Sequence, residues 1–395
     1  MRVMSEPWLS IIGLGEDGPA GLSDASRDAV AKAEVVFGAP RHLALMGLGA
    51  RGQAWPVPFD LAPLLALRGR RVAMLVSGDP FWFGAGGSVA AHLRPDEWVA
   101  HPVAGVFSLL AARMGWRLEE VLCLGLHAAP FERLRPVLAR GVRVICTLRD
   151  AQAVVDLSNW LAANGFAAAQ LTVAEALGGP RERLRQGADW PDITAPVAVA
   201  IDGAALPLTA GLPRASGLPD ALFQHDGQIT KAAIRAITLS GLAPRPGERL
   251  WDIGAGSGSV SVEWALAGGR AICIEARGDR AANIRANASS FGLGHRIEVQ
   301  EGRAPQGLGD LPLPDAVFVG GGGDAALYAA LWALLPPGTR IVANGVTLEA
   351  ESQLAHLHAT HGGTLLRLDL AEAGTLGRFR DWQAARPVVQ WRGQR

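Results

Sequence analysis

The sequence predicts an α/β protein with two domains in tandem, and three observations support this prediction. The chain has 395 residues, of which 49% are hydrophobic, so it is too long for one ordinary core and has enough apolar residues for two. Short apolar runs alternate with segments whose apolar residues have helical spacing, which indicates mostly parallel sheets covered by helices. The alternation stops between Asp202 and Leu218, where glycine, proline and other small residues predominate. We therefore expect domains at 1–202 and 218–395, joined by a linker at 203–217.

The alternation places each element. In the N-terminal half, we expect strands within 10–15 and at 35–37, 72–76, 142–146 and 197–201, with helices at 23–33 and 151–164. In the C-terminal half, a second doubly wound unit is expected, with strands at 249–253, 271–274, 297–300, 316–319 and 340–343 and helices at 230–240, 260–267, 280–291 and 325–335.

The balance of charge points to a small substrate. The 37 basic and 37 acidic residues cancel, so no overall field favours nucleic acid or an anionic membrane. No segment has the pattern of a secretory leader and no apolar run approaches the ~20 residues of a membrane span, so we expect a cytoplasmic protein. The cysteines Cys123, Cys146 and Cys273 lie far apart in apolar runs, which is typical of buried thiols, and no metal site is expected.

A glycine loop follows the first strand of the C-terminal half. Gly254, Gly256 and Gly258 come after a strand that carries Asp252, and the next strand ends in Glu275. Glycines at this point let the backbone pass close to a nucleoside, and a carboxylate at the end of the next strand can accept the ribose hydroxyls. A dinucleotide fingerprint needs a third glycine after two intervening residues, so the spacing favours S-adenosylmethionine, which has no phosphate. Asp252 either meets the amino group of that ligand or orders the loop.

The N-terminal half contains two further glycine motifs. Gly13-Leu-Gly15-Glu-Asp-Gly18 matches a dinucleotide fingerprint, but Pro19 and Gly21 delay the helix to about Ser23, so its N-terminus is not aimed at the loop. We therefore interpret this motif as something other than a phosphate loop. The segment Val76-Ser-Gly-Asp-Pro-Phe-Trp-Phe-Gly84 is a strand that ends in a Gly-Asp-Pro turn followed by aromatic residues.

Two long runs, 217–236 and 242–259, extend the C-terminal glycine loop, and the first contains Gln224-His-Asp-Gly-Gln-Ile-Thr-Lys231. Together with 315–323 and 342–349, they resemble the decarboxylating precorrin methyltransferases of cobalamin biosynthesis. The resemblance implies a Rossmann-like class I methyltransferase domain in which S-adenosylmethionine is contacted by Thr230, Gly254, Ala255, Gly256, Ser257, Gly258, Glu275 and Ala304. The residues implied at the substrate mouth are Gly320, Gly321 and Asn344, and Arg303 is a candidate anchor for a substrate carboxylate.

The turn at 76–84, together with 101–108 and 124–128, resembles the tetrapyrrole methylase family. That resemblance implies a two-lobed α/β fold for the N-terminal domain, with the Gly-Asp-Pro turn in the cleft between the lobes. It also implies that Gly78, Asp79, Pro80 and Gly105 contact S-adenosylmethionine, and that Gly13 and Gly15 face the macrocycle.

Both families in this order on one chain imply a bifunctional enzyme of cobalamin biosynthesis. Such an enzyme would methylate precorrin-6Y at carbons 5 and 15, with one S-adenosylmethionine site in each domain, and would remove carbon dioxide from the ring-C acetate at carbon 12, giving precorrin-8. Its partner would be a small tetrapyrrole, without nucleic acid or membrane, and we expect a homo-oligomer. No catalytic residue is assigned, because neither half displays a nucleophile with an evident activating base, and positioning can carry most of the rate. The histidines His101, His127 and His225 are expected to be structural or substrate-orienting, because no carboxylate pairs with them in the sequence.

The sequence motifs also permit other interpretations. The glycine loop alone permits a tight turn without a ligand, or a methyltransferase of RNA, protein or another tetrapyrrole. A dehydrogenase with two Rossmann domains, or a non-catalytic nucleotide-binding module, is disfavoured by the glycine spacing. Asp79 can instead cap a turn and Thr230 can be a helix N-cap. The aromatic residues Trp82 and Phe83 can belong to the core or line a cleft.

Overall fold

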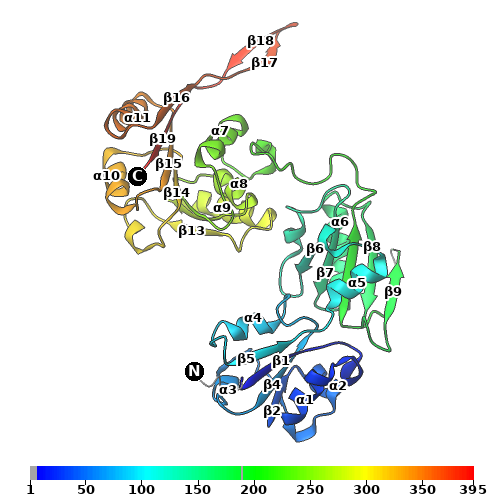
Figure 1. Ribbon diagram of the computed structural model, residues 1–395. Helices are drawn as coiled ribbons and strands as arrows, with labels where there is room; N and C mark the ends of the chain where they lie inside the picture. The colour runs from blue at the N-terminus through cyan, green and yellow to red at the C-terminus, as the bar shows by residue number, and fades with distance from the viewer. Residues whose placement is uncertain (1–6, 188–189) are drawn as a thin grey trace. The chain divides into compact units, whose positions relative to one another are not determined.

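The computed structural model describes residues 7–187 and 190–395 and divides the chain into two compact units (Figure 1). The N-terminal unit comprises Met1–Phe131 and Leu138–Ala210. The C-terminal unit comprises Gly211–Arg395 together with the short segment Glu132–Val137. Within the described ranges, no helix is both long enough and apolar enough to cross a membrane.

The N-terminal unit begins with a parallel sheet in the order β3-β2-β4-β1-β5. Nearly all residues of β1 and β4 are buried, as expected for strands covered on both faces. The predicted helix start is confirmed, because the Ser23 hydroxyl accepts a hydrogen bond from the Ser26 N–H as an N-cap. The elements are β1 (Leu9–Leu14), α1 (Asp24–Lys32), β2 (Val35–Gly38), α2 (Pro40–Met46), β3 (Gly52–Ala54), α3 (Ala62–Leu65), β4 (Val72–Ser77), α4 (Ala85–Ala90) and β5 (Trp98–His101).

The second sheet of this unit has the order β6-β7-β10-β8-β9 and is mostly antiparallel. β6 and β7 are parallel, whereas β10 lies between β7 and β8 and is antiparallel to both. The prediction of mostly parallel sheets is therefore wrong for this lobe, because an apolar run that is buried on both faces does not encode the direction of its strand. The elements are α5 (Val106–Met114), β6 (Val121–Gly125), β7 (Arg143–Leu148), α6 (Ala151–Ala163), β8 (Gln170–Glu175), β9 (Arg183–Gln186) and β10 (Val197–Asp202).

The C-terminal unit has a seven-stranded sheet in the order β13-β12-β11-β14-β15-β19-β16. The first five strands in this order are parallel. At one edge, β19 pairs antiparallel with β15, and β16 pairs antiparallel with β19. This confirms the predicted Rossmann-like fold. The elements are α7 (Ala232–Leu242), β11 (Arg249–Ile253), α8 (Ser259–Leu266), β12 (Arg270–Glu275), α9 (Gly278–Ser290), β13 (Ile297–Glu301), β14 (Ala316–Val319), α10 (Ala325–Leu334), β15 (Arg340–Gly345), α11 (Leu348–His361), β16 (Thr364–Leu368) and β19 (Val388–Gln394).

Alternate residues of β11 contribute to two cores on opposite faces of this sheet. Leu250 packs in a cluster with residues of α7, α8 and α9, and Trp251 packs in a cluster with residues of α10 and α11. Helices therefore cover both faces, and the carboxyl ends of β11, β12 and β14 lie along one edge. The C-terminal glycine loop begins at that edge.

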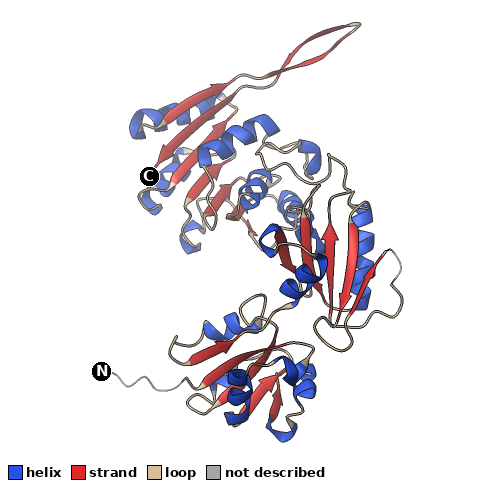
Figure 2. Ribbon diagram, turned by 45° about the vertical axis from the view of Figure 1, so that its right-hand side comes forward, coloured by secondary structure: helices blue, strands red, loops and turns tan. Residues whose placement is uncertain are grey.

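A hairpin that the sequence analysis does not predict extends away from the seven-stranded sheet (Figure 2). It consists of β17 (Ala371–Leu376) and β18 (Phe379–Ala384), which pair antiparallel. Leu376, Phe379 and Trp382 are 59%, 63% and 72% exposed. A two-stranded hairpin of this kind is at best marginally stable on its own in water.

Candidate active sites

The C-terminal glycine loop, Gly254–Gly258, requires glycine for its backbone conformation. Gly254, Gly256 and Gly258 have φ values of 68°, 59° and 70°, in the left-handed region. Packing adds a second constraint: a Cβ on Gly258 would lie 2.8 Å from Ile284 Cγ2, and one on Gly254 would lie 3.0 Å from the Gly321 carbonyl oxygen. These constraints hold with or without a bound ligand, so only the groups around the loop can indicate that a ligand binds there.

Glu275, the last residue of β12, lies directly against this loop. Its carboxylate accepts hydrogen bonds from the Gly256 N–H at 2.9 Å and from the Arg277 N–H at 3.0 Å. Each of the two oxygens is thereby held by one backbone donor and keeps a further acceptor position. A carboxylate with free acceptor positions can bind the hydroxyls of a ribose, and this contact stays a prediction for Glu275.

Asp252 lies in β11, two residues before the glycine loop, and is hydrogen-bonded to the helix that follows the loop. Its Oδ2 accepts a hydrogen bond from the Ser261 hydroxyl on α8 at 2.7 Å, and the Cys273 thiol donates to the same hydroxyl oxygen at 3.0 Å. The side chain is completely buried, and this burial raises the pKa of Asp252 to about 7. This hydrogen bond joins β11 to α8, which flank the loop, while Oδ1 has no hydrogen-bond partner among the described residues, so both roles considered for Asp252 stay predictions.

Three further residues predicted for this site lie next to the loop. The Gly320 N–H donates to the Ile253 carbonyl at 3.0 Å, which places Gly320 and Gly321 beside the end of β11. Ala304 follows β13, where the Gly302 N–H donates to the Glu275 carbonyl at 2.9 Å. The fold thus brings the ends of three strands together around the loop.

Thr230 lies in the segment that precedes α7. The N-cap of that helix is Lys231, and its side chain makes no cap hydrogen bond, so the alternative of Thr230 as an N-cap is wrong. The segment is tied to the glycine loop by Asn287, whose Nδ2 donates to the Gln224 carbonyl at 2.9 Å and to the Ser257 carbonyl at 2.8 Å. Contact between Thr230 and S-adenosylmethionine stays a prediction.

Asn344 and Arg303, two predicted substrate contacts, differ in burial. Asn344 is buried, its Nδ2 donates to the Thr238 hydroxyl at 3.1 Å, and its Oδ1 accepts from Gln390 Nε2 at 2.8 Å. Its amide is therefore part of a buried polar network between β15, β19 and α7. Arg303 is exposed, next to Ala304. Substrate contact at both residues stays a prediction.

A buried ion pair that the sequence analysis does not single out holds the segment before α7. Arg235 on α7 is completely buried, and its Nε donates to Glu263 Oε1 on α8 at 2.5 Å. Glu263 also accepts from the Gly217 N–H at 2.7 Å and the Leu218 N–H at 2.9 Å, and Arg235 donates to the Thr230 carbonyl. Because a buried charge requires such partners, the pair fixes the course of 217–230 over the loop. An arginine and a glutamate inside apolar helices are the features that could have indicated it.

In the N-terminal unit, the predicted glycines form a cluster, Gly13, Gly78 and Gly105, although they come from three separate segments. A Cβ on Gly13 would lie 2.0 Å from the Gly78 carbonyl oxygen, and one on Gly78 would lie 2.6 Å from Gly105 Cα. A Cβ on Gly105 would lie 3.3 Å from the Asp79 nitrogen. This N-terminal glycine cluster lies at the carboxyl ends of the strands: Gly13 is the fifth residue of β1, and Gly78 and Gly105 follow β4 and β5. Parallel sheets bind ligands at this end. Gly15 follows β1 directly.

The Gly-Asp-Pro turn carries three exposed aromatic residues. Asp79 Oδ1 accepts a hydrogen bond from the Phe81 N–H at 2.8 Å, so its capping role is confirmed, and Pro80 is buried. Trp82 and Phe83 are 53% and 56% exposed, so the core alternative for them is wrong. The turn therefore presents apolar aromatic surface to solvent.

The three histidines have no carboxylate partner among the described residues. His127 Nδ1 lies 3.4 Å from the Thr147 hydroxyl, and His225 Nδ1 accepts from the Gly227 N–H at 3.0 Å. His101 ends β5. No acid–base pair arises from these residues.

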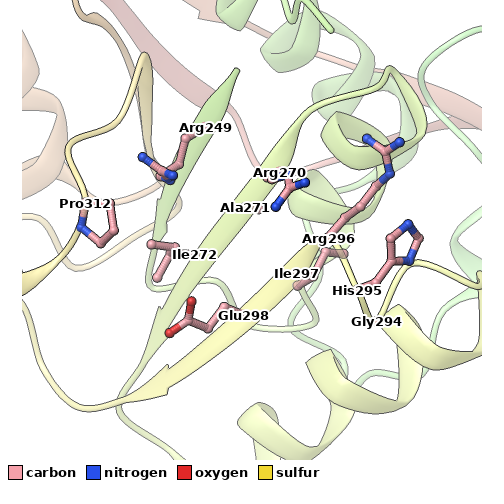
Figure 3. Close-up of a pocket in the computed structure, with 10 residues that line it drawn as sticks. All are labelled: Arg249, Arg270, Ala271, Ile272, Gly294, His295, Arg296, Ile297, Glu298 and Pro312. Carbon is pink, nitrogen blue, oxygen red and sulfur yellow. The ribbon is translucent and has the colours of Figure 1, made fainter. Parts of the chain in front are cut away.

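A cavity of about 290 Å³ opens at the other edge of the C-terminal sheet (Figure 3). Its lining includes Arg249, Arg270 and Ile297, which are the first residues of β11, β12 and β13. The glycine loop follows the last residue of β11, so this cavity is distinct from the candidate active site.

Two family models match consecutive parts of the chain, and together they define a methyltransferase of tetrapyrroles. The tetrapyrrole (corrin/porphyrin) methylase family matches residues 9–188, and the precorrin methyltransferase domain family matches residues 221–395. The chain is 44% identical to the precorrin-6Y C(5,15)-methyltransferase [decarboxylating] of a Sinorhizobium species, over 98% of this chain and 96% of that relative. It is 36% identical to the enzyme of the same name from a Mycobacterium tuberculosis strain, over 96% and 98%.

The chain therefore belongs to the precorrin-6Y C5,15-methyltransferase (decarboxylating) family, and this membership implies S-adenosylmethionine as methyl donor. The crystal structure of the C-terminal domain of precorrin-6Y C5,15-methyltransferase from Rhodobacter capsulatus is 61% identical to the matched part of the chain. It covers 47% of this chain and 100% of its own, with a TM-score of 0.46.

Proposed function

We propose that the chain methylates precorrin-6Y at carbon 5 in an N-terminal domain spanning 1–202 and at carbon 15 in a C-terminal domain spanning 218–395. The C-terminal domain also removes carbon dioxide from the ring-C acetate, which gives precorrin-8, and each domain binds its own S-adenosylmethionine. The observation that carries this proposal is the match of both domain families, in this order, on one chain that aligns with decarboxylating relatives over nearly its whole length.

In the C-terminal domain, the described residues bind and orient the methyl donor. The donor supplies an electrophilic methyl group on a sulfonium. The glycine loop lets the nucleoside approach the backbone, and Glu275 accepts its ribose hydroxyls. Asp252 and the Arg235–Glu263 pair keep the loop and the segment above it in place. Methyl transfer to an electron-rich carbon needs an in-line, water-free arrangement, so this positioning accounts for catalysis without a covalent intermediate.

Decarboxylation requires little from the protein beyond binding. The bond between the acetate methylene carbon and its carboxylate breaks, carbon dioxide leaves, and the electron pair enters the conjugated ring system of the substrate, which later takes a proton. The domain needs only to hold the other carboxylates and to leave the departing one poorly solvated. Arg303, Gly320, Gly321 and Asn344 remain the proposed substrate contacts.

In the N-terminal domain, we propose that the Gly-Asp-Pro turn and Gly105 contact the second S-adenosylmethionine. Gly13 and Gly15 then face the macrocycle. The meeting of these segments at the carboxyl end of one parallel sheet supports this assignment, because such sheets bind ligands there.

We also propose that the protein is a homo-oligomer whose copies associate through the hairpin β17–β18. The exposed apolar side chains of the hairpin support this, as does its separation from the seven-stranded sheet.

The test is incubation of the full chain with precorrin-6Y and methyl-labelled S-adenosylmethionine, followed by mass analysis. The proposal expects two labelled methyl groups gained and one carbon dioxide lost. A chain that labels RNA or protein but not the precorrin would favour the alternative methyltransferases. A chain that binds NAD and not S-adenosylmethionine would overturn the proposal.

A further inference from the structure

We propose that Arg181 binds a side-chain carboxylate of the tetrapyrrole beside the loop Gly13–Gly18, and that Glu16 and Arg41 hold Arg181 in position for this contact. The inference rests on the proposed function, because it takes a carboxylate-bearing macrocycle as the substrate of the N-terminal unit. It adds a specificity-determining residue that none of the sequence motifs contains.

Glu16 is the centre of this cluster. It lies in the loop between Gly15 and Gly18, and its side chain is only 7% exposed. Its Oε1 pairs with Arg41 Nη1, and its Oε2 accepts from Arg181 Nη2 at 3.4 Å. One nearly buried carboxylate is therefore shared by two guanidinium groups from different segments.

The segment that carries Arg181 approaches Glu16 closely. A Cβ on Gly179 would lie 2.6 Å from the Cβ of Glu16 and 2.7 Å from the carbonyl oxygen of Glu16, so only glycine fits at this position. The Gly179 N–H donates to the Ala176 carbonyl at 3.1 Å, which closes a turn just before Arg181. The backbone thus fixes Arg181 against the loop that the sequence assigns to the macrocycle.

The polar groups of Arg41 are already occupied. Its Nη2 donates to the Ser77 hydroxyl at 3.0 Å and lies 3.1 Å from His42 Nε2. Burial, followed by the charge of Arg41, lowers the pKa of His42 to about 4, so His42 is neutral at neutral pH and adds no charge. Arg41 therefore acts as a positioning residue.

Arg181 is the member of the cluster with free capacity. Its side chain is 60% exposed, and Glu16 is its one polar partner within the described ranges. The adjacent acid, Glu182, is instead held by Arg113 in two hydrogen bonds at 2.6 and 3.1 Å. Most of the guanidinium donors of Arg181 thus face solvent.

The charges in the cluster do not cancel. Two guanidinium groups share the single charge of Glu16, and Asp17 in the same loop makes no ion pair with either arginine among the described residues. One positive charge therefore remains on a half-exposed, planar donor group. A carboxylate is the ligand that such a group binds best, through two parallel hydrogen bonds. Since a precorrin carries several carboxylate side chains, it supplies this ligand.

The experiment compares Arg181→Gln and Arg181→Lys with the wild-type full chain. Arg70→Gln is the matched control, because Arg70 is a similarly exposed arginine (52%) in an ion pair with Glu34 within the same unit. Methylation at carbon 5 is followed by mass analysis while the precorrin-6Y concentration is varied, and S-adenosylmethionine is then varied separately. Circular dichroism and thermal melting report the folding of each variant.

The inference expects Arg181→Gln to raise KM for the precorrin about 10-fold, with kcat and KM for S-adenosylmethionine unchanged. Arg181→Lys should recover part of the loss, because it keeps the charge without the planar fork. The difference from wild type should shrink as salt is added. Arg70→Gln should match wild type.

A precorrin KM that stays within 2-fold of wild type in a folded Arg181→Gln protein would overturn the inference and leave the cluster as a structural clamp. If Arg181→Gln does not fold, Arg181→Lys decides: an unchanged KM and salt dependence overturn the inference in the same way. Failure of the wild-type chain to methylate carbon 5 would instead count against the proposed function.

Discussion

The C-terminal glycine loop and the N-terminal glycine cluster are both candidate ligand sites, but they are built differently. In the first, three glycines of one five-residue segment take left-handed conformations, and the buried Asp252 on the preceding strand bonds Ser261 on the following helix. In the second, Gly13, Gly78 and Gly105 are 92 residues apart at the extremes and meet only because three strands end at one edge. A local site depends on backbone conformation and on a few anchoring side chains. A site assembled from distant segments depends on backbone-to-backbone contact, and it tolerates no added atom.

The largest effect is expected for Gly13→Ala. The new Cβ would overlap the Gly78 carbonyl oxygen at 2.0 Å and crowd the Val103 nitrogen at 2.9 Å, and backbone cannot move aside as a side chain can. We expect the N-terminal unit to lose at least about 3 kcal/mol of stability and the chain to lose methylation at carbon 5. Calorimetry and product mass analysis measure both effects.

Gly87→Ala is the control for that substitution. Gly87 lies in α4 of the same unit, and its nearest neighbour is 4.0 Å from an added Cβ. This variant should melt no lower than wild type, because alanine favours helix over glycine. If Gly13→Ala behaved like Gly87→Ala, the tight assembly of the N-terminal cluster would be refuted.

The next largest effect is expected for the buried Asp252, and it concerns the pH dependence of the free energy of unfolding. Burial raises the pKa of Asp252 to about 7, so the folded chain binds this proton more tightly than the unfolded chain, in which the pKa is about 4. The stability linked to this proton is present below about pH 4 and is lost as pH rises through about 7. Asp252→Asn removes this dependence.

Relative to wild type, the stability of the Asp252→Asn variant should therefore rise between pH 5 and pH 8, by a few kcal/mol at most. Denaturant unfolding of the C-terminal unit at several pH values measures the difference. Asp279→Asn is the control, because Arg277 lowers the pKa of this exposed carboxyl and its linkage has the opposite sign. A difference that does not change with pH would show that Asp252 is ionised at no cost in the folded chain.

A smaller effect is expected for Glu275→Gln. The substitution removes the charge that we propose accepts the ribose hydroxyls, and should weaken binding at the C-terminal S-adenosylmethionine site about 10-fold or more. Isothermal titration of the wild-type chain should show two sites, and in this variant one of them should weaken. Glu301→Gln, on the neighbouring strand and paired with Arg285, should leave both sites unchanged. Weakening of both sites by Glu275→Gln would contradict the separation of the two domains.

The smallest effect separates the two roles of Asp79. Asp79→Asn keeps an oxygen for the Phe81 N–H, whereas Asp79→Ala loses that hydrogen bond and should cost about 1 kcal/mol. If Asp79 acts only as a turn cap, Asp79→Asn retains N-terminal S-adenosylmethionine binding and Asp79→Ala weakens it modestly. Equal losses in both variants would indicate that the charge itself contacts the ligand.

Sequence patterns predicted the elements better than their assembly. The strands at 249–253 and 316–319 are confirmed at both ends, because short apolar runs bounded by polar or glycine residues mark buried parallel strands. The antiparallel direction of β10 and the hairpin β17–β18 were not predicted. Neither is encoded by local periodicity: the direction of β10 depends on its neighbours, and the hairpin lacks a buried face of its own.

The candidate sites show the same difference between features that are local in the sequence and contacts between distant residues. The C-terminal loop could be predicted because its glycines follow β11 and Glu275 ends β12, the next strand, so a short stretch of sequence contains both. The Arg235–Glu263 pair and the Glu16–Arg181 contact could not be predicted, because each joins residues 28 or 165 positions apart.

The sequence by itself determined the two-domain α/β organisation, the family and the C-terminal glycine loop, because each depends on residues that are close together in the chain. Only the tertiary structure decided that Asp252 is buried, that Gly13, Gly78 and Gly105 stack, and that Arg181 reaches Glu16. These contacts join the ends of strands from different parts of the chain, and their distances are set by how the sheets pack and not by local propensity.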